Sequence, residues 1–323
     1  MKKRHLLAAA ALLVVGSAGP AMAQGADYPN KAIRIVVPVT AGSGTDATAR
    51  FLANALGKAW NATVIVENKP GAGASLGSEL VAKAAPDGYT LLFTYAAHYS
   101  NQWVLKLNFD AVKDFEPVAR LANSTLVVAT RGDSPIRNMS DLIAAAKKSP
   151  GQVSYASAGL GSTGHMAGAL LGKMAGIQLN HVPYKAASQV PVDAASGQVD
   201  IMIGGLASAL PLIRSGRLHP IAVTAAKRSA NLPNVPTVAE QGLSGYENSS
   251  PIWVMAPRGT PQEIVNRLSA QLTRIAATPE FKDYCFNQGI EVDIQDAATF
   301  KAQAPAELHK WKQLVELTSP ERS

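Results

Sequence analysis

Short apolar, β-branched runs alternate with longer stretches of helical spacing along most of this chain. The first run, 33–37, leads through a Gly-rich turn into an Ala- and Leu-rich stretch at 47–60. Further apolar runs at 63–66 and 90–94 enclose a second helical stretch at 75–85. Strands that alternate with helices in this way form a parallel sheet with helices on its faces. The pattern therefore predicts an α/β fold.

The same alternation continues to the C-terminal region. Further strands are expected at 126–129, 153–156, 182–184, 200–203 and 220–223, and helices at 140–148, 163–175, 187–196 and 207–214. The tail is helical, because Thr260-Pro261-Gln262-Glu263 has the form of a capping box with proline at the first helical position. Thr278-Pro279 repeats this start, and a last helix is expected at 296–317, where Pro305 predicts a kink or a break.

Two extended segments, 118–130 and 249–256, connect blocks that look self-contained. We interpret them as two crossings between two α/β lobes, each a mostly parallel sheet flanked by helices. One lobe then contains residues 24–122 and 249–323, and the other is a central insertion, 123–248. Hinges are expected near Asn123-Ser124 and Ser249-Ser250.

Residues 1–23 have the three parts of a secretory signal peptide. Lys2, Lys3 and Arg4 form a basic head, residues 6–15 are apolar, and Ala21-Met22-Ala23 is a small-residue cleavage site. The apolar run is too short to span a bilayer as a helix. We therefore expect an exported protein that is cleaved near Ala23.

The charge of the chain argues against nucleic acid as a partner. The formal net charge is +7, and Lys2, Lys3 and Arg4 supply three of these charges, so the rest carries +4. No run of basic residues stands out, and a modest excess without such a run suits a small anionic ligand better. Cys285 is the only cysteine, which excludes an internal disulfide and a multi-thiolate metal site.

Two Gly-rich turns, at 40–46 and 157–165, each run from an expected strand into an expected helix. Glycine lets the backbone turn tightly, and a helix N-terminus offers unpaired N–H groups and a partial positive charge. Such turns form an anion cradle that needs no Lys or Arg. A third Gly-rich stretch, 68–77, also leads into a helix and could reach the same cleft or simply connect two elements.

Other interpretations of these turns stay open. Gly42-x-Gly44-x-x-Ala47 fits the dinucleotide fingerprint, with Glu67 at the end of the next strand, so an exported NAD-dependent oxidoreductase is an alternative. Asp46, in the first helical turn, would repel a pyrophosphate. The turns could also be tight connections that bind nothing.

No arrangement of residues in the sequence indicates catalysis. The histidines at 98, 165, 181 and 219 lack metal-ligand spacing, and no nucleophile elbow or pair of carboxylates stands out. His165 lies in a first helical turn, where a capping or packing role is favoured. We therefore expect no catalytic residue, no metal site and no cofactor.

Ten short segments, in this order and spacing, resemble the Bug or TctC-type proteins, the extracytoplasmic solute receptors of tripartite tricarboxylate transporters. They are Tyr28-Pro29, Val37-Pro38, Gly42-Ser43-Gly44-Thr45-Asp46, Ala49-Arg50, Glu67-Asn68-Lys69-Pro70-Gly71-Ala72-Gly73, Pro86-Asp87-Gly88-Tyr89-Thr90-Leu91, Gly161-Ser162 with His165, Val182-Pro183-Tyr184-Lys185, Gly197-Gln198-Val199-Asp200 and Ala256-Pro257-Arg258-Gly259-Thr260-Pro261. The resemblance covers essentially all of the chain after the leader.

The resemblance implies a periplasmic binding protein of the two-lobe, type II-like fold, which is not an enzyme. It implies a small carboxylate ligand, held between the lobes by the two Gly-rich loops, and delivery to the membrane permease subunits. We expect a monomer; a ligand-sensing partner of a membrane signalling protein is an alternative. We hypothesise that the aromatic segment 95–103 favours an aromatic mono- or dicarboxylate such as terephthalate, with a di- or tricarboxylate as the alternative ligand. These aromatic side chains could instead pack the core of the lobe.

The residues expected to bind the ligand come from the Gly-rich loops and their neighbours. They are Thr40, Gly42, Ser43, Gly44, Thr45, Asp46, Ala72, Ser75, Tyr95, His98, Ser157, Gly161, Ser162, Thr163, His165, Lys185 and Gly204.

Overall fold

The structure is a computed structural model that describes residues 28–318. The expected signal peptide, residues 1–23, lies outside the described residues. The strands are β1 (Ile33–Val37), β2 (Val64–Asn68), β3 (Thr90–Tyr95), β4 (Phe115–Arg131), β5 (Ser154–Ser157), β6 (Asn180–Pro183), β7 (Ile201–Gly205), β8 (Leu218–Val223), β9 (Ser249–Pro257) and β10 (Ile290–Gln295).

The α-helices alternate with these strands over most of the chain. They are α1 (Gly44–Trp60), α2 (Ser75–Ala82), α3 (Ala97–Val104), α4 (Met139–Lys148), α5 (Thr163–Ala175), α6 (Gln189–Ser196), α7 (Leu206–Arg214), α8 (Gln262–Ala276), α9 (Pro279–Asn287) and α10 (Ala297–Thr318). Two short 3₁₀ helices, η1 (Ala72–Ala74) and η2 (Ala239–Gln241), lie in connections.

The strands form a mixed sheet in the order β2-β1-β3-β9-β4-β7-β5-β6, with β8 and β10 also paired to β4. The outer strands are parallel to their neighbours, β1 with β2 and β3, and β5 with β6 and β7. All pairs that involve β4 or β9 are antiparallel. The expected α/β class is confirmed, but the centre of the sheet is antiparallel because two long neighbouring strands run through it.

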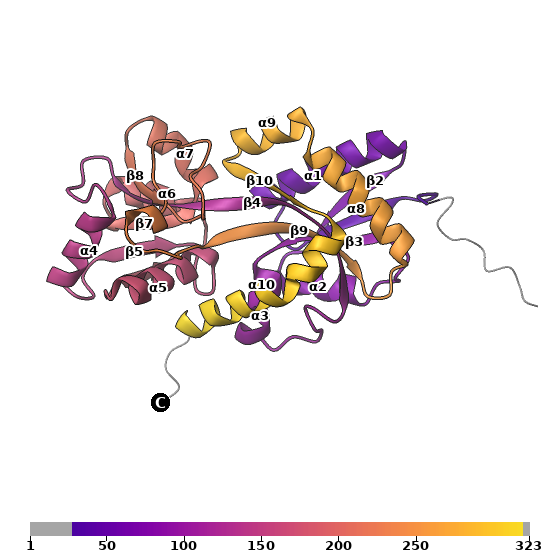
Figure 1. The fold of residues 1–323 in the computed structure, drawn as a ribbon, viewed down its shortest axis with the longest axis horizontal. Coiled ribbons are helices and arrows are strands. Elements are labelled where there is room, and N and C mark those ends of the chain that lie inside the picture. The colour runs from indigo at the N-terminus through magenta and orange to yellow at the C-terminus, as the bar shows by residue number, and fades with distance from the viewer. Residues whose placement is uncertain (1–27, 319–323) are drawn as a thin grey trace, which may run out of the picture.

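The two expected crossings are these strands, β4 and β9. The first part of β4 pairs with β9 and β10, and its last part, from Leu126 on, pairs with β7 and β8. Figure 1 shows β4 and β9 side by side between two groups of elements. The first group contains β1, β2, β3 and β10, and the second contains β5, β6, β7 and β8. They are paired where one group passes into the other, Ser124 with Ser250 and Thr125 with Ser249. The division into lobes at residues 123 and 249 stays a prediction.

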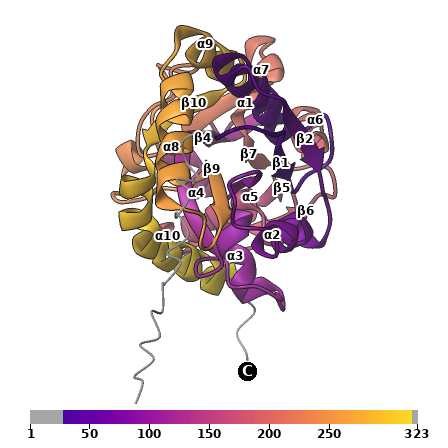
Figure 2. The ribbon, with the colours of Figure 1, turned by 90° about the vertical axis from the view of Figure 1, so that its right-hand side faces the viewer.

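Alternate residues of the strands pack on opposite faces of the sheet, as the period of two requires. In the group that contains β1, β2 and β3, Leu91 and Phe93 pack with α1, α8 and α9 on one face of the sheet. Leu92 packs with α2, α3 and α10 on the other face. Figure 2 shows α1 and α9 at one side of the strands and α2 and α3 at the opposite side. The second group has two cores as well, one beneath α4 and α5 and one beneath α6 and α7.

Helix α10 packs on both groups. Phe300 and Trp311 belong to the core of the first group, where Phe300 stacks on Trp253. Near its C-terminal end, Leu314 packs in the same cluster as Met166 of α5, and Lys310 pairs with Glu247 at 3.4 Å. The helix continues through Pro305, so the break expected there as one outcome does not occur.

Of the two helix starts predicted from Thr-Pro pairs in the C-terminal region, one is confirmed in detail and one is not. Thr278 caps α9, because its Oγ1 accepts the N–H of Phe281, and Pro279 is the first helical residue as expected. The capping box expected at Thr260 is wrong: its hydroxyl donates to the carbonyl of Pro257, and α8 begins at Gln262 after Pro261. A local turn therefore takes the hydroxyl that the box would have used. The sequence pattern did not predict α3 or β10.

Arg120 links β4 to both α10 and β10 through a largely buried cluster of charges. Its guanidinium lies 3.0 Å from Glu307 and 2.6 Å from Asp293, and Trp311 Nε1 donates to Glu307 at 3.1 Å. Only 9% of the Arg120 side chain is exposed, so removal of this cation leaves carboxylates without their counter-charge.

We expect Arg120→Met to lower the free energy of unfolding by about 3 kcal/mol, the low end for a broken buried pair because Asp293 is partly exposed. Lys301→Met is the matched control, since it removes an exposed ion pair between α10 and Glu116 of β4 and should cost less than about 1 kcal/mol. Urea unfolding followed by circular dichroism measures both. Equal costs would contradict the role given to the Arg120 cluster.

Candidate functional site

A cavity of about 550 Å³ lies between the two groups of elements, beside the β4–β9 crossing. Its wall includes Tyr95 at the end of β3, Gly204 at the end of β7, and Ser124 and Ser250 from the crossing strands. The loop before α5 and the helix α3 form further parts of the wall. The remaining lining residues are Ala72, Gly73, Ala97, Asn101, Val104, Leu105, Leu126, Ala158, Leu160, Gly161, Ser162, Thr163, Gly164, Met166, Ile203 and Gly205.

The loop before α5 and the first residues of that helix line this cavity, with Gly161, Ser162, Thr163 and Gly164. Gly161 has φ +72°, a conformation that L side chains rarely adopt, and its N–H donates to Nδ1 of His165 at 3.1 Å. Ser162 caps the helix, because its Oγ accepts the N–H of His165 at 3.2 Å. The N–H groups of Thr163 and Gly164 have no intrahelical acceptor, since they belong to the first turn. They are available to an anion.

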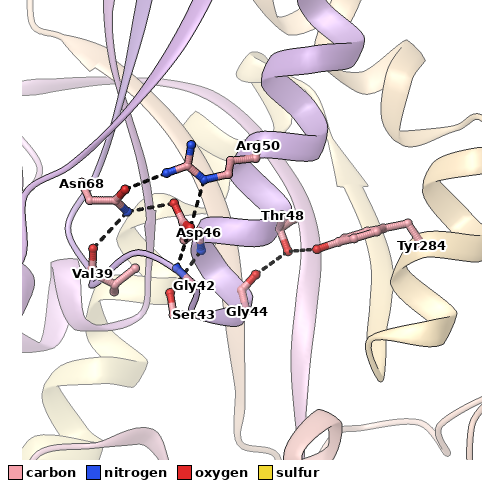
Figure 3. A network of polar contacts seen from close by, with 9 residues as sticks. All are labelled: Val39, Gly42, Ser43, Gly44, Asp46, Thr48, Arg50, Asn68 and Tyr284. Carbon is pink, nitrogen blue, oxygen red and sulfur yellow. Dashed lines mark hydrogen bonds and ion pairs between the residues drawn. The ribbon is translucent and has the colours of Figure 1, made fainter.

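The loop before α1 has the same construction (Figure 3). Gly42 has φ +82°, and its N–H donates to Oδ2 of Asp46 at 2.8 Å. Ser43 caps the helix by accepting the N–H of Asp46 at 3.2 Å. The N–H groups of Gly44 and Thr45 are then the unpaired ones of the first turn.

The two loops thus repeat one device, Gly-Ser-x-x followed by a side-chain acceptor. In each, the glycine N–H is bound by the side chain four residues later, and serine caps the helix. The equal spacing of Asp46 and His165 after their glycines was a sequence signal for this role. Asp46 and His165 therefore each hold the conformation of their own loop.

Asp46 is buried and anionic. Burial alone would raise its pKa, but hydrogen bonds from Arg50, Gly42 and Asn68 outweigh that effect, and the pKa lies below its ordinary value. Arg50 Nε lies 3.1 Å from Oδ2, and Asn68 Nδ2 lies 2.8 Å from Oδ1 (Figure 3). The carboxylate is therefore compensated inside the loop.

His165 is neutral at ordinary pH. Burial lowers its pKa to about 4, and the neighbouring His181 lowers the pKa further. The two imidazole rings are stacked, with their centroids 4.1 Å apart. A neutral ring with an unprotonated Nδ1 is what the bond from Gly161 requires. Behind it, His181 Nε2 lies 2.7 Å from the hydroxyl of Ser157.

The structure brings part of the expected ligand site to the cavity wall. Those residues are Ala72, Tyr95, Gly161, Ser162, Thr163 and Gly204. The other expected residues do not line it; they are Thr40, Gly42, Ser43, Gly44, Thr45, Asp46, Ser75, His98, Ser157, His165 and Lys185. The helix α3 and the apolar wall around Leu126 and Ile203 carry no motif, so the sequence did not indicate them.

His98 is a core residue and does not face the cavity. It is 1% exposed, its Nδ1 lies 3.1 Å from the hydroxyl of Ser78, and its Nε2 lies 2.8 Å from the carbonyl of Ala111. Burial lowers its pKa to about 4. Tyr99 is also buried and packs on Trp253. The aromatic segment 95–103 therefore contributes one aromatic ring, Tyr95, to the wall.

Other chemistry has little support among residues 28–318. No three His, Cys, Asp or Glu side chains in this range converge as metal ligands. Burial raises the pKa of the Cys285 thiol to about 12, which makes it a poor nucleophile. None of the helices in this range is long and apolar enough to cross a bilayer.

Residues 48–319 match the tripartite tricarboxylate transporter family receptor, TctC. The chain belongs to this family. It is therefore a solute-binding receptor of the periplasmic binding protein type and not an enzyme, which excludes the oxidoreductase alternative. The expected family and fold are confirmed.

Relatives and solved structures match this chain over nearly its whole length. Protein BugT of Bordetella pertussis is 31% identical over 98% of each chain. The structure of R. palustris Rpa4515 with adipate is 31% identical, with a TM-score of 0.80 over 90% of this chain and 98% of that one. MatC of Rhodopseudomonas palustris with bound malate is 28% identical, with a TM-score of 0.76 over 89% and 100%.

Asp46→Ala should increase hydrogen exchange of the Gly42 amide about tenfold, because one charge-assisted hydrogen bond is lost. His165→Ala should do the same to Gly161. NMR of both variants measures the two amides together, so each variant is the control for the other. Exchange that rises at neither glycine, or at both in either variant, would contradict the independent construction of the loops.

The free energy of unfolding should fall as the pH decreases from about 6.5 to about 4.5. His98 and His165 have pKa values near 4 in the folded protein and near 6.5 when unfolded, so the unfolded chain binds more protons in this range. Each group contributes at most about 1.4 kcal/mol per pH unit. Denaturant titrations at several pH values should show that the free energy of unfolding depends less steeply on pH in His165→Asn than in the wild type. An equal pH dependence in the two proteins would refute the lowered pKa of His165.

Proposed function

We propose that this protein is a periplasmic receptor that captures a small carboxylate in the cleft between its lobes and delivers it to the permease of a tripartite tricarboxylate transporter. The observation that carries the proposal is that the loop before α5 lines the cavity with Thr163 and Gly164, whose N–H groups have no intrahelical acceptor. Family membership and the adipate- and malate-bound relatives support a carboxylate as the ligand. Export through the segment 1–23 and a monomeric state belong to the same proposal.

In this proposal one carboxylate lies at the N-terminus of α5. The N–H groups of Thr163 and Gly164 donate to its oxygens, and the helix dipole favours the negative charge. The hydroxyl of Thr163 lines the cavity and can add a donor, whereas the hydroxyl of Ser162 already donates to Ser157. Charged side chains are not needed, because the partial charges are fixed by the backbone.

The loop before α1 completes the site when the lobes close. Its residues do not line the cavity in the present conformation, yet its construction is the same and its Gly44 and Thr45 N–H groups are unpaired. A carboxylate that accepts from both loops binds the closed form more tightly than the open one. Binding therefore shifts the population toward closure.

The hinge of this motion lies where β4 and β9 cross between lobes, at the Ser124–Ser250 pair. Lobe 1 then comprises residues 24–122 and 249–323, and lobe 2 comprises 123–248. Helix α10 contacts both lobes, because its Phe300 packs in the core of lobe 1 and its C-terminal end packs near Met166 of α5 in lobe 2. Closure must therefore either keep this contact or move α5 along the helix.

Calorimetric titration with adipate, malate, citrate, benzoate and terephthalate tests the proposal. At least one should bind with a micromolar dissociation constant, and Ser162→Trp should weaken it at least tenfold because the indole fills the loop's face of the cavity. Ser140→Trp, exposed on α4 and away from the lining, is the control and should bind like the wild type. No binding of any carboxylate, or equal binding by Ser162→Trp, would overturn the site.

A further inference from the structure

Three hydroxyl groups lie together on the side of the cavity that is formed by the sheet. They belong to Tyr95 at the end of β3, Ser250 on β9 and Ser124 on β4, and all three residues line the cavity. Their strands are neighbours in the order β3-β9-β4. These three residues are called the hydroxyl cluster below.

The pairing of the strands puts the three side chains on one face of the sheet. Ser124 lies directly opposite Ser250, so their Cβ atoms are about 5 Å apart. Tyr95 lies opposite Ile252, which is two residues from Ser250 and therefore points to the same face. Such a diagonal neighbour is about 7–8 Å away, within reach of an aromatic side chain. One small group of a ligand can therefore contact hydroxyls from all three strands.

The hydroxyls of the cluster are unpaired. None of them has a hydrogen-bond partner among residues 28–318, and none is sealed from solvent. Ser250 is nevertheless only 8% exposed, and a polar side chain buried to this degree normally has a partner. Burial raises the pKa of the Tyr95 phenol above its ordinary value, so this hydroxyl stays protonated and can donate. The cluster thus offers O–H donors that the described part of the chain does not use.

The other polar side chains of the lining have different roles. Asn101 donates to the carbonyl of Gly73, and the hydroxyl of Ser162 donates to that of Ser157. Thr163 lies at the N-terminus of α5, where the proposed function places the first carboxylate. The hydroxyl cluster belongs to other elements, so it is available to the opposite end of the same ligand.

We propose that the hydroxyl cluster binds an oxygen-bearing group at the far end of the ligand, which is therefore a carboxylic acid with a second polar end. This inference rests on the proposed function, which supplies the site of the first carboxylate at α5. The far group accepts hydrogen bonds from the hydroxyls of Tyr95, Ser124 and Ser250, as the oxygen of a hydroxyl or a second carboxylate can. No cation is required, because neutral O–H donors bind a charged acceptor more strongly than a neutral one.

Matched acids test the proposal by calorimetric titration. Butyrate, pentanoate and hexanoate are each compared with the dicarboxylate and the terminal hydroxy acid of the same length, and benzoate is compared with terephthalate and 4-hydroxybenzoate. In at least one set, an acid with a second oxygen-bearing end should bind at least about tenfold more tightly than its monoacid, because two or three hydrogen bonds are gained. The dicarboxylate and hydroxy acid arms tell which oxygen group the cluster takes. Monoacids that bind as tightly as their partners in every set would overturn the inference.

Ser250→Ala and Tyr95→Phe each remove one hydroxyl of the cluster with little change in the shape of the cavity. Each should weaken the binding of the preferred acid about fivefold and leave the binding of its monoacid unchanged. Ser249→Ala is the matched control, because Ser249 is the adjacent residue of β9, points to the opposite face and lies outside the lining. It should bind both acids like the wild type. No loss in either cluster variant, or the same loss for both acids, would refute the role of the cluster.

The outcomes separate this inference from the proposed function. If monoacids bind with micromolar affinity and a second oxygen-bearing end adds nothing, the receptor function stands and the hydroxyl cluster is not part of the ligand site. If no carboxylate of any class binds, the proposed function itself fails and the inference fails with it.

Discussion

The backbone pairing of β4 with β9 is the interaction on which the rest of this structure depends. Both strands pass from one group of elements to the other, and they remain paired at the passage, where Ser124 lies opposite Ser250. Because the two strands belong to both groups, they form one side of the cavity between those groups, at Ser124, Leu126 and Ser250. Loops attached to other strands can then face each other across it, which is how residues far apart in sequence form one wall.

The two Gly-rich loops, to which the proposed function assigns the carboxylate, contain no Lys or Arg side chain. Each loop places a glycine in the left-handed region and binds its N–H to a side chain four residues later. One acceptor is a carboxylate compensated by Arg50, and the other is a neutral imidazole. The chemistry of the acceptor differs, but in both loops the first two N–H groups of the helix, directly after the capping serine, stay unpaired. Net charge does not register such a site.

Helix α10 and the Arg120 cluster add a constraint on how the two groups move. The helix is held to β4 and β10 by buried charges and packs against α5 of the other group. A change in the angle between the groups must therefore alter the packing of its C-terminal end. The proposed closure is coupled to this helix, whose path the sequence left open.

Local features were predictable from the sequence because they depend on neighbouring residues. The strand at 33–37, the helix at 163–175 and the cap at Thr278 follow from hydrophobic period and backbone hydrogen bonding within a few residues. The tertiary structure alone decided which side chains reach the cavity. His98 belongs to an aromatic segment but is buried, whereas Val104 and Leu105 of the same segment's helix and its cap line the cavity. Burial and cavity shape are set by contacts between distant strands, which no local pattern records.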